Sequence, residues 1–224
     1  MPSLSSLTRF APLRSVFGAG RSDLLGRLAQ LSVLYEDLRL ETLGIAAEGD
    51  QLSRLDQSDP RYRRLYFLRR SVATIFEFRR VLNKLLQTKE YGKAVAALQI
   101  EKGLREIIEQ ANSFLATKHE LIKRLRNDVG GHFDERAAEF ATRNVSEQAV
   151  GKLEITAYHS GYGAGPTLHF AGEIVATAFA RSLDHDKPRD DELSRVIGTI
   201  RDCYEQASKA MHALAAAFLW ERFQ

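Results

Sequence analysis

Apolar side chains recur at helical spacing along most of the first 130 residues. Over residues 24–45 they mark one helix face, and Ser22 or Asp23 stands where an N-cap belongs. A second helix is predicted from Pro60 to about Gln87, because Asp59 can cap it and proline is favoured at the first helical position. A third helical region is predicted over residues 92–130, with residues 112–113 as a candidate interruption and two glycines at its end.

The hydrophobic period changes after Phe140, from about 3.6 residues to 2. Asp134 can cap a short helix that runs through Phe140. Leu153, Ile155 and Ala157 then alternate with polar residues, a glycine-rich loop follows, and residues 167–170 form a second extended run. This pattern predicts a small β-hairpin around residues 152–170. Helical spacing returns over residues 172–183 and 193–218.

These elements predict a mainly α protein, a helical bundle with one small β-hairpin insertion, because long amphipathic helices bury their apolar faces against each other. We expect a single globular unit with three parts. Residues 1–21 form an N-terminal arm, residues 22–145 the helical core, and residues 146–224 the hairpin and two C-terminal helices, which pack on the core.

Composition narrows the class of protein. The 224 residues are 44% hydrophobic and 27% charged, as in ordinary globular domains, and the longest apolar run, residues 213–220, is too short to cross a membrane. The single cysteine, Cys203, offers neither an internal disulfide nor a zinc-binding pattern, so a reducing, cytoplasmic setting is expected. A net charge of +3 does not by itself indicate a nucleic-acid-binding protein.

The N-terminal segment has two interpretations. It carries three arginines and several serines, with no acidic residue before Asp23, which is the composition of a transit peptide. Alternatively it is an arm that docks on the domain through apolar residues such as Leu13 and Val16. It lacks an apolar segment of signal-peptide length, so secretion is not expected.

The most distinctive segment is residues 125–133, Leu-Arg-Asn-Asp-Val-Gly-Gly-His-Phe. An arginine, a polar residue, four further positions and a histidine near the end of a long helix resemble the signature of the HEPN superfamily. Its members are small helical bundles, and many are metal-independent ribonucleases that dimerise to form the active site. The resemblance implies that Arg126 and His132 are the catalytic pair, that Asn127 supports them, and that no metal or other cofactor takes part.

These residue types suit RNA cleavage. Histidine titrates near neutrality and can exchange a proton with a ribose 2′-hydroxyl or a leaving 5′-oxygen, while arginine offers bidentate donors to a phosphate. On a regular helix the side chains of Arg126 and His132 would point about 120° apart, so a helix break or a second subunit must bring them together. In the structural alternative, residues 129–131 are a helix C-cap and His132 only packs against the turn.

A second candidate site lies on the helix that starts at Pro60. Between residues 61 and 84 there are eight basic residues and a single acid, Glu77. A helical wheel gathers several of them with one aromatic residue on a basic stripe that suits RNA phosphates and a stacked base. The predicted RNA-binding residues are Arg63, Tyr66, Arg69, Arg70, Arg80 and Lys84. Alternatively the stripe faces solvent and pairs with acidic neighbours such as Asp184, Asp186, Asp190 and Asp191.

Other polar residues carry weaker expectations. His119 and His212 are expected to pack or to face water, and Glu36, Asp37 and Glu41 to form surface salt bridges or to support the motif.

Two functions therefore stay open. The first is an endoribonuclease of the toxin or phage-defence kind that cuts single-stranded RNA as a homodimer, with an antitoxin or regulatory protein as a further partner. The second is a non-catalytic helical interaction module that holds RNA or a protein partner.

Overall fold

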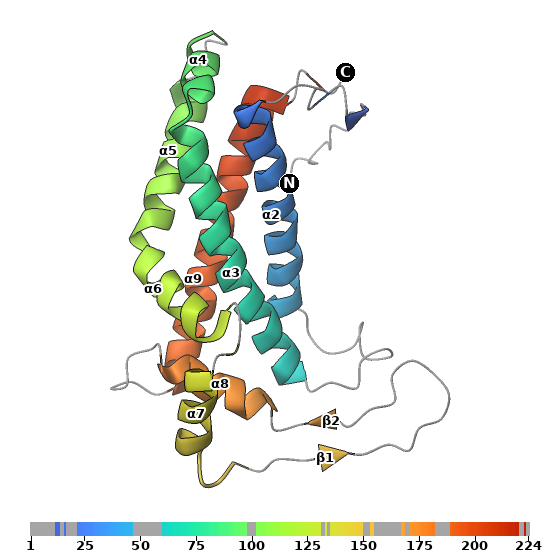
Figure 1. Cartoon of the computed structure of the whole chain (residues 1–224), viewed down its shortest axis with the longest axis vertical. Coiled ribbons are helices and arrows are strands. Elements are labelled where there is room, and N and C mark those ends of the chain that lie inside the picture. The colour runs from blue at the N-terminus through green and yellow to red at the C-terminus, as the bar shows by residue number, and fades with distance from the viewer. Residues whose placement is uncertain are drawn as a thin grey trace, which may run out of the picture. The chain divides into compact units, whose positions relative to one another are not determined.

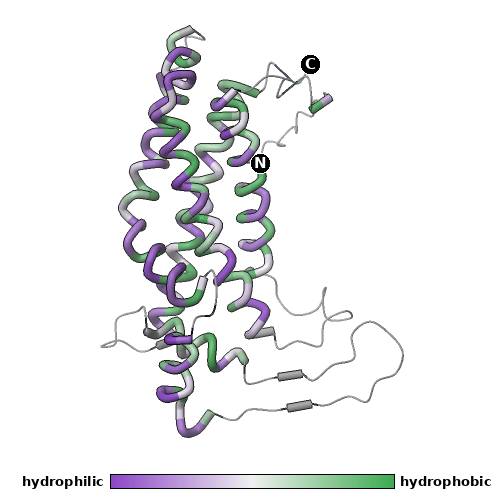
Figure 2. The backbone as a smooth tube through the Cα atoms, viewed as in Figure 1, coloured by the Kyte–Doolittle hydropathy of each residue, from purple (hydrophilic) through white to green (hydrophobic). Residues whose placement is uncertain are grey.

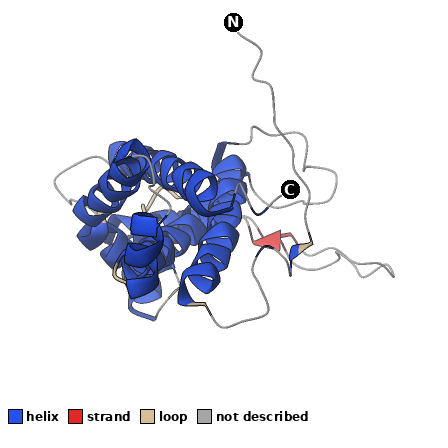
Figure 3. Cartoon of the chain, turned by 90° about the horizontal axis from the view of Figure 1, so that it is seen from above, coloured by secondary structure: helices blue, strands red, loops and turns tan. Residues whose placement is uncertain are grey.

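The computed structural model describes most of the helical part of the chain (Figure 1). The described residues are 12, 13, 16, 22–46, 60–97, 102–130, 133, 135–149, 153–154, 167–168, 171–181, 189–219 and 222. Helices make up almost all of this part, as Figure 3 shows. None of the described helices is long and apolar enough to cross a membrane.

The helices follow the hydrophobic periodicity of the sequence, and Figure 2 shows apolar and polar residues alternating along them. Their bounds are α2 Asp23–Ala46, α3 Pro60–Leu86, α4 Lys89–Ala97, α5 Lys102–Thr117, α6 His119–Leu125, α7 Glu135–Asn144, α8 Ala171–Arg181 and α9 Arg189–Leu214. Two π-helical segments follow directly on α6 and α9, namely η1 Arg126–Gly130 and η2 Ala215–Leu219. The mainly helical class predicted from the sequence is therefore confirmed.

Local signals set where the first two long helices begin. The hydroxyl of Ser22 accepts a hydrogen bond from the backbone N–H of Leu25 at 3.2 Å, which confirms Ser22 as the N-cap of α2. Glu90 on α4 adds a second cap, since its carboxylate accepts the N–H of Leu24 at 2.9 Å. Hydrogen bonds from the N–H of Leu24 and from the hydroxyl of Ser22 hold the pKa of Glu90 below its usual value. Helix α3 begins at Pro60, as predicted.

The interruption predicted at residues 112–113 is wrong. Helix α5 continues through both residues, and the break comes at Lys118, where the backbone lies at φ −93° and ψ −2°. Ala111 and Leu115 are both buried, so the apolar face of α5 runs on across the two polar residues and keeps them helical.

Strands are a minor feature of the described residues. Leu153–Glu154 (β1) and Thr167–Leu168 (β2) pair antiparallel, with Leu153 opposite Leu168. The predicted hairpin of residues 152–170 is thus represented only by a two-residue ladder, and its glycine-rich loop lies outside the described residues.

The chain divides into two compact units, each built from separate stretches of sequence. Unit 1 comprises residues 1–35, 77–116 and 205–224, and unit 2 comprises residues 36–76 and 117–204. In unit 1 most of the buried side chains come from α2, α3, α5 and α9, with Leu28, Phe78 and Ile108 fully buried, and α4 and η2 add a few more. The arm contributes Val16, which is buried and whose carbonyl accepts a hydrogen bond from Arg222, whereas Leu13 is exposed.

Unit 2 contains the whole of the described part of the motif. Helix α7 packs against α8, and both contact η1. Helices α2 and α3 approach each other closely here, because a Cβ on Gly44 would overlap the ring of Phe67. Leu68, Val72, Leu125 and Val129 are buried in this unit.

Candidate functional site

The motif begins where the backbone changes from an α-helix to a π-helical turn. Arg126 closes α6, and its N–H is shared between the carbonyls of Ile122 and Lys123. From this residue the turn widens, and η1 ends by burying Val129 and Gly130. A π-turn places different residues on one face than an α-helix does, so the 120° separation expected for Arg126 and His132 on a regular helix does not apply here.

Helix α3 holds the end of this turn. The Nε of Arg69 donates a hydrogen bond to the carbonyl of Val129 at 2.7 Å, and its guanidinium carbon lies 5.6 Å from the centroid of the Phe133 ring. A Cβ on Gly130 would lie 3.1 Å from Val72 and 3.3 Å from the carbonyl oxygen of Arg69. The described residues on both sides of positions 131 and 132 are therefore held against α3.

Gly130 thus serves a contact within the chain. The sequence suggested that the two glycines let another backbone approach, and for Gly130 that backbone is α3 of the same chain. Since Gly130 is buried, it does not offer a surface to a second subunit. Gly131 and His132 lie outside the described residues.

Arg126 lies over an aromatic ring. Its guanidinium carbon is 4.4 Å from the centroid of Phe76, a cation–π distance, and its side chain is partly exposed. His119 stacks on the same phenylalanine, with ring centroids 5.5 Å apart and planes 20° apart. Asn127, the next residue along the chain, is exposed.

The link between His119 and the motif is what sequence reasoning missed. His119 is expected to pack or to face water, and it packs on Phe76, the ring that the motif arginine also contacts. A signal was present, because His119 and Arg126 are seven residues apart and seven residues return to nearly the same face of an α-helix.

The predicted RNA-binding residues are spread over both units. Unit 2 holds Arg63, Tyr66, Arg69 and Arg70, whereas Arg80 and Lys84 belong to unit 1. Tyr66 and Lys84 are exposed, while Arg63 is buried and keeps only 9% of its surface accessible to solvent.

Three of these arginines have partners within the chain. Arg69 bonds the carbonyl of Val129, and the Nε of Arg70 lies 3.7 Å from a carboxylate oxygen of Glu41. Arg80 forms an ion pair of 2.5 Å with Glu77, one helical turn away. The acids that pair with the stripe are therefore Glu41 and Glu77. Of the four aspartates expected in this role, the structure describes the side chain of Asp191 alone, and it is exposed.

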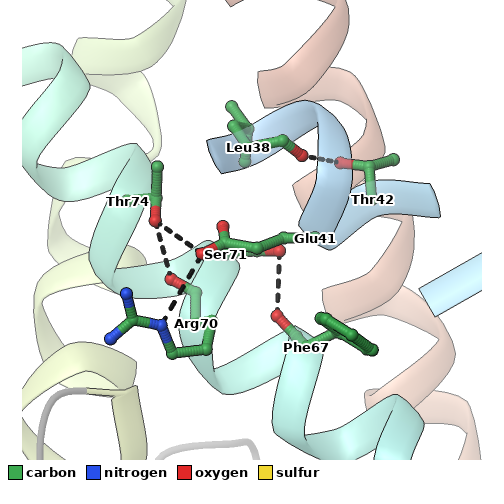
Figure 4. A network of polar contacts seen from close by, with 7 residues as sticks. All are labelled: Leu38, Glu41, Thr42, Phe67, Arg70, Ser71 and Thr74. Atoms are coloured by element: carbon green, nitrogen blue, oxygen red, sulfur yellow. Dashed lines mark hydrogen bonds and ion pairs between the residues drawn. The ribbon is translucent and has the colours of Figure 1, made fainter. Parts of the chain in front are cut away.

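Glu41 is a buried acid, not the surface or motif-supporting group expected from the sequence. Its carboxylate accepts a hydrogen bond from Thr74 at 2.9 Å, and Figure 4 shows it extending from α2 toward Thr74, Ser71 and Arg70 on α3. Its second oxygen, Oε2, is buried without a hydrogen-bond partner. Burial raises the pKa of Glu41 from 4.5 to about 7, against the lowering effects of Thr74 and Arg70.

Metal ligation and thiol chemistry have no support among the described residues. They include no cluster of three or more histidine, cysteine or acidic side chains that could hold a metal ion. Cys203 is buried and unpaired, and burial raises the pKa of its thiol to about 12, so the reactive thiolate is scarce at neutral pH.

Comparison with known proteins assigns no family. No family model matches the chain, and no curated protein and no solved structure matches it.

Proposed function

We propose that the chain is a metal-independent endoribonuclease of the HEPN toxin or phage-defence type, which cuts single-stranded RNA in the cytoplasm at a site shared by two subunits. The observation that carries the proposal is the position of Arg126. Its guanidinium is partly exposed, 4.4 Å over Phe76, at the first residue of a π-helical turn that carries the motif. Such turns occur frequently at functional sites.

The stacking of Arg126 is compatible with phosphate binding. The guanidinium carbon of Arg126 lies 4.4 Å from the Phe76 centroid, and an arginine can combine such an aromatic contact with bidentate binding of phosphoryl oxygens. An arginine held in this way loses less side-chain freedom when it binds. In the proposed reaction it stabilises the negative charge that builds on the phosphoryl oxygens.

His132 supplies the proton transfers in this proposal. The ribose 2′-hydroxyl attacks the adjacent phosphorus and gives its proton to one histidine, while the leaving 5′-oxygen takes a proton from another. The products are a 2′,3′-cyclic phosphate and a 5′-hydroxyl end. Because the motif contains one histidine, a two-fold dimer supplies the second. An antitoxin or regulatory protein would act by covering this site.

Subunit mixing tests the shared site. We expect Arg126→Ala and His132→Ala each to abolish cleavage as purified homodimers. An equimolar mixture of wild type and His132→Ala, after exchange of subunits, should keep only about a quarter of the activity of the wild-type dimer, because each heterodimer holds one histidine and lacks the second proton-transfer group. Arg124→Ala is the matched control, because Arg124 is an exposed arginine on α6 outside the motif. A mixture that keeps about half of the activity although heterodimers form would contradict a site built from both subunits, because each wild-type subunit would then work alone.

The second candidate, a non-catalytic interaction module, is favoured by a different observation. Arg69, Arg70 and Arg80 have partners within the chain, so part of the basic stripe is already neutralised. RNA that binds without being cut, together with a monomeric protein, would favour this module over the enzyme. The number of phosphates that the stripe contacts then follows from the salt dependence of RNA binding. Each contact adds about 0.7 to 0.9 to the slope of the logarithm of the binding constant against the logarithm of salt concentration.

A further inference from the structure

A cavity of about 550 Å³ lies within unit 2, between the C-terminal part of α2, the N-terminal part of α3 and the N-terminal part of α9. This volume falls in the range of about 300 to 1,000 Å³ that is usual for small-molecule sites. Its wall is mostly aliphatic, with Leu65, Leu68, Ile197 and Ile200 among its residues. Ile197 keeps 42% of its surface exposed, so apolar surface is left open to solvent here.

The charged residues described at this cavity have one sign. Among the described residues, its lining includes two arginines, Arg64 of α3 and Arg201 of α9, and no acidic residue. Arg64 is exposed, and Arg201 has a partner 4.0 Å away in Asp202, with both side chains at least half exposed. An exposed pair of this kind stabilises by less than about 1 kcal/mol, so a ligand carboxylate can replace Asp202.

Two of the described polar groups near the cavity are already engaged within the chain. The hydroxyl of Thr42, also in the lining, donates to the carbonyl of Leu38 at 2.8 Å and is thus used within α2. Glu192, one residue before the lining residue Leu193, binds the guanidinium of Arg195 through both carboxylate oxygens. The ligand that matches aliphatic walls and two arginines is an amphipathic anion.

We propose that this cavity binds a small amphipathic carboxylate, such as a free medium-chain fatty acid, with its hydrocarbon chain against Leu65, Leu68 and Ile197 and its carboxylate at Arg64 and Arg201. The described lining of the cavity includes none of the proposed catalytic residues, and the proposal does not rest on the ribonuclease function. Arginine suits the headgroup because its planar donors bind a carboxylate in a bidentate manner.

Calorimetric titration of the full-length protein with decanoate, octanoate and decylammonium at pH 7.5 tests the site. Decanoate is expected to bind about 15-fold more tightly than octanoate, because each buried methylene contributes about fourfold in affinity. Decylammonium has the same chain and the opposite charge, and is expected to bind at least tenfold more weakly than decanoate.

Variants of the cavity distinguish binding of the ligand's carboxylate from binding of its hydrocarbon chain. The double variant Arg64→Gln/Arg201→Gln is expected to lose the preference for decanoate over decylammonium, whereas Arg136→Gln, an exposed arginine of α7 outside the cavity, keeps it. Ile197→Trp fills the cavity from its exposed side and is expected to weaken decanoate binding at least tenfold with an unchanged unfolding midpoint. Absence of decanoate binding at 1 mM, equal affinity for the two headgroups, or unchanged binding by Ile197→Trp would overturn the proposal.

Discussion

The two π-helical turns, η1 and η2, share a backbone form but carry different side chains. Each follows an α-helix and buries its last two residues, Val129 and Gly130 in η1 and Phe218 and Leu219 in η2. The other residues of η1 are Arg, Asn and Asp, whereas those of η2 are three alanines. A π-turn is therefore not a sign of function by itself, and the chemical case for η1 rests on its side chains.

The two turns are also held by different forces. In unit 1, Phe218 of η2 lies against Tyr91, with ring centroids 5.8 Å apart. In unit 2, α3 holds η1 through a hydrogen bond from Arg69 and through close contact at Gly130. We therefore expect substitutions in η2 to change stability alone, and substitutions around η1 to separate stability from chemistry.

The largest change in stability is expected at η2. Phe218→Ala removes a buried ring beside Tyr91 and should lower the free energy of unfolding by about 3 to 5 kcal/mol in urea titrations. Phe218→Leu, the control that keeps most of the apolar volume, should cost clearly less. If both variants were as stable as wild type, apolar packing would not be what holds η2.

The next effect depends on pH and lies in unit 2. The pKa of Glu41 is raised to about 7 in the folded state, so folding favours its neutral form. The contribution of Glu41 to the free energy of unfolding is thus highest below its unfolded pKa of about 4.5. It falls as the pH rises toward 7, by about 3 kcal/mol in all. Glu41→Gln should be more stable than wild type at pH 8, by up to that amount, and should lose this advantage near pH 4.5.

Urea titrations from pH 4.5 to pH 8 check this expectation. Glu36→Gln is the control, because Glu36 is an exposed acid on the same helix that pairs with Arg39. Equal pH dependence of wild type and Glu41→Gln would show that the carboxyl group is not neutral in the folded protein.

Gly130→Ala sharpens the contrast between the two turns further. The new methyl group would meet Val72 and the carbonyl of Arg69, and we expect a loss of about 1 to 3 kcal/mol in thermal or urea unfolding. In Gly26→Ala the methyl group meets nothing within 4 Å inside α2, and this variant should gain about 0.5 to 1 kcal/mol. A stable Gly130→Ala variant would mean that α3 and η1 do not pack closely.

The smallest effect is expected from the hydrogen bond between α3 and η1. Arg69→Gln removes the donor to the buried Val129 and should cost about 1 to 2 kcal/mol, measured by urea unfolding. Arg70→Gln, on the next residue, removes only the long contact to Glu41 and should cost less. A larger loss of stability in Arg70→Gln than in Arg69→Gln would show that the hydrogen bond from Arg69 is not what holds η1.

Helix positions were predictable where a local signal sets them. Ser22 and Pro60 mark the beginnings of α2 and α3 through capping and proline preference, which depend on neighbouring residues alone. The break at Lys118 was not predictable, because neither glycine nor proline marks it. The polar residues Asn112 and Ser113 favoured a break at the wrong position. The π-turn at Arg126 was also missed, since hydrophobic periodicity assumes a constant turn.

The candidate site was predictable only in part. Arg126 and Asn127 were named from a motif, but the stacking of Arg126 and His119 on Phe76 depends on how α6 meets α3. Burial of Glu41 depends likewise on a neighbouring helix. One sequence signal favoured it, because Glu41 lies about one helical turn after Leu38, which is buried. Contacts between helices carry no direct signal in a single sequence.

The central claim is tested most directly by RNA cleavage in excess chelator, with end-group analysis of the products. We expect the wild-type protein to leave 2′,3′-cyclic phosphate ends, and Arg126→Ala and His132→Ala each to lower the rate at least about 100-fold. Both variants should keep wild-type stability and dimerisation, and Arg124→Ala should cut normally. Undiminished cleavage by His132→Ala, or a wild-type dimer that cuts no RNA, would contradict the proposed enzyme.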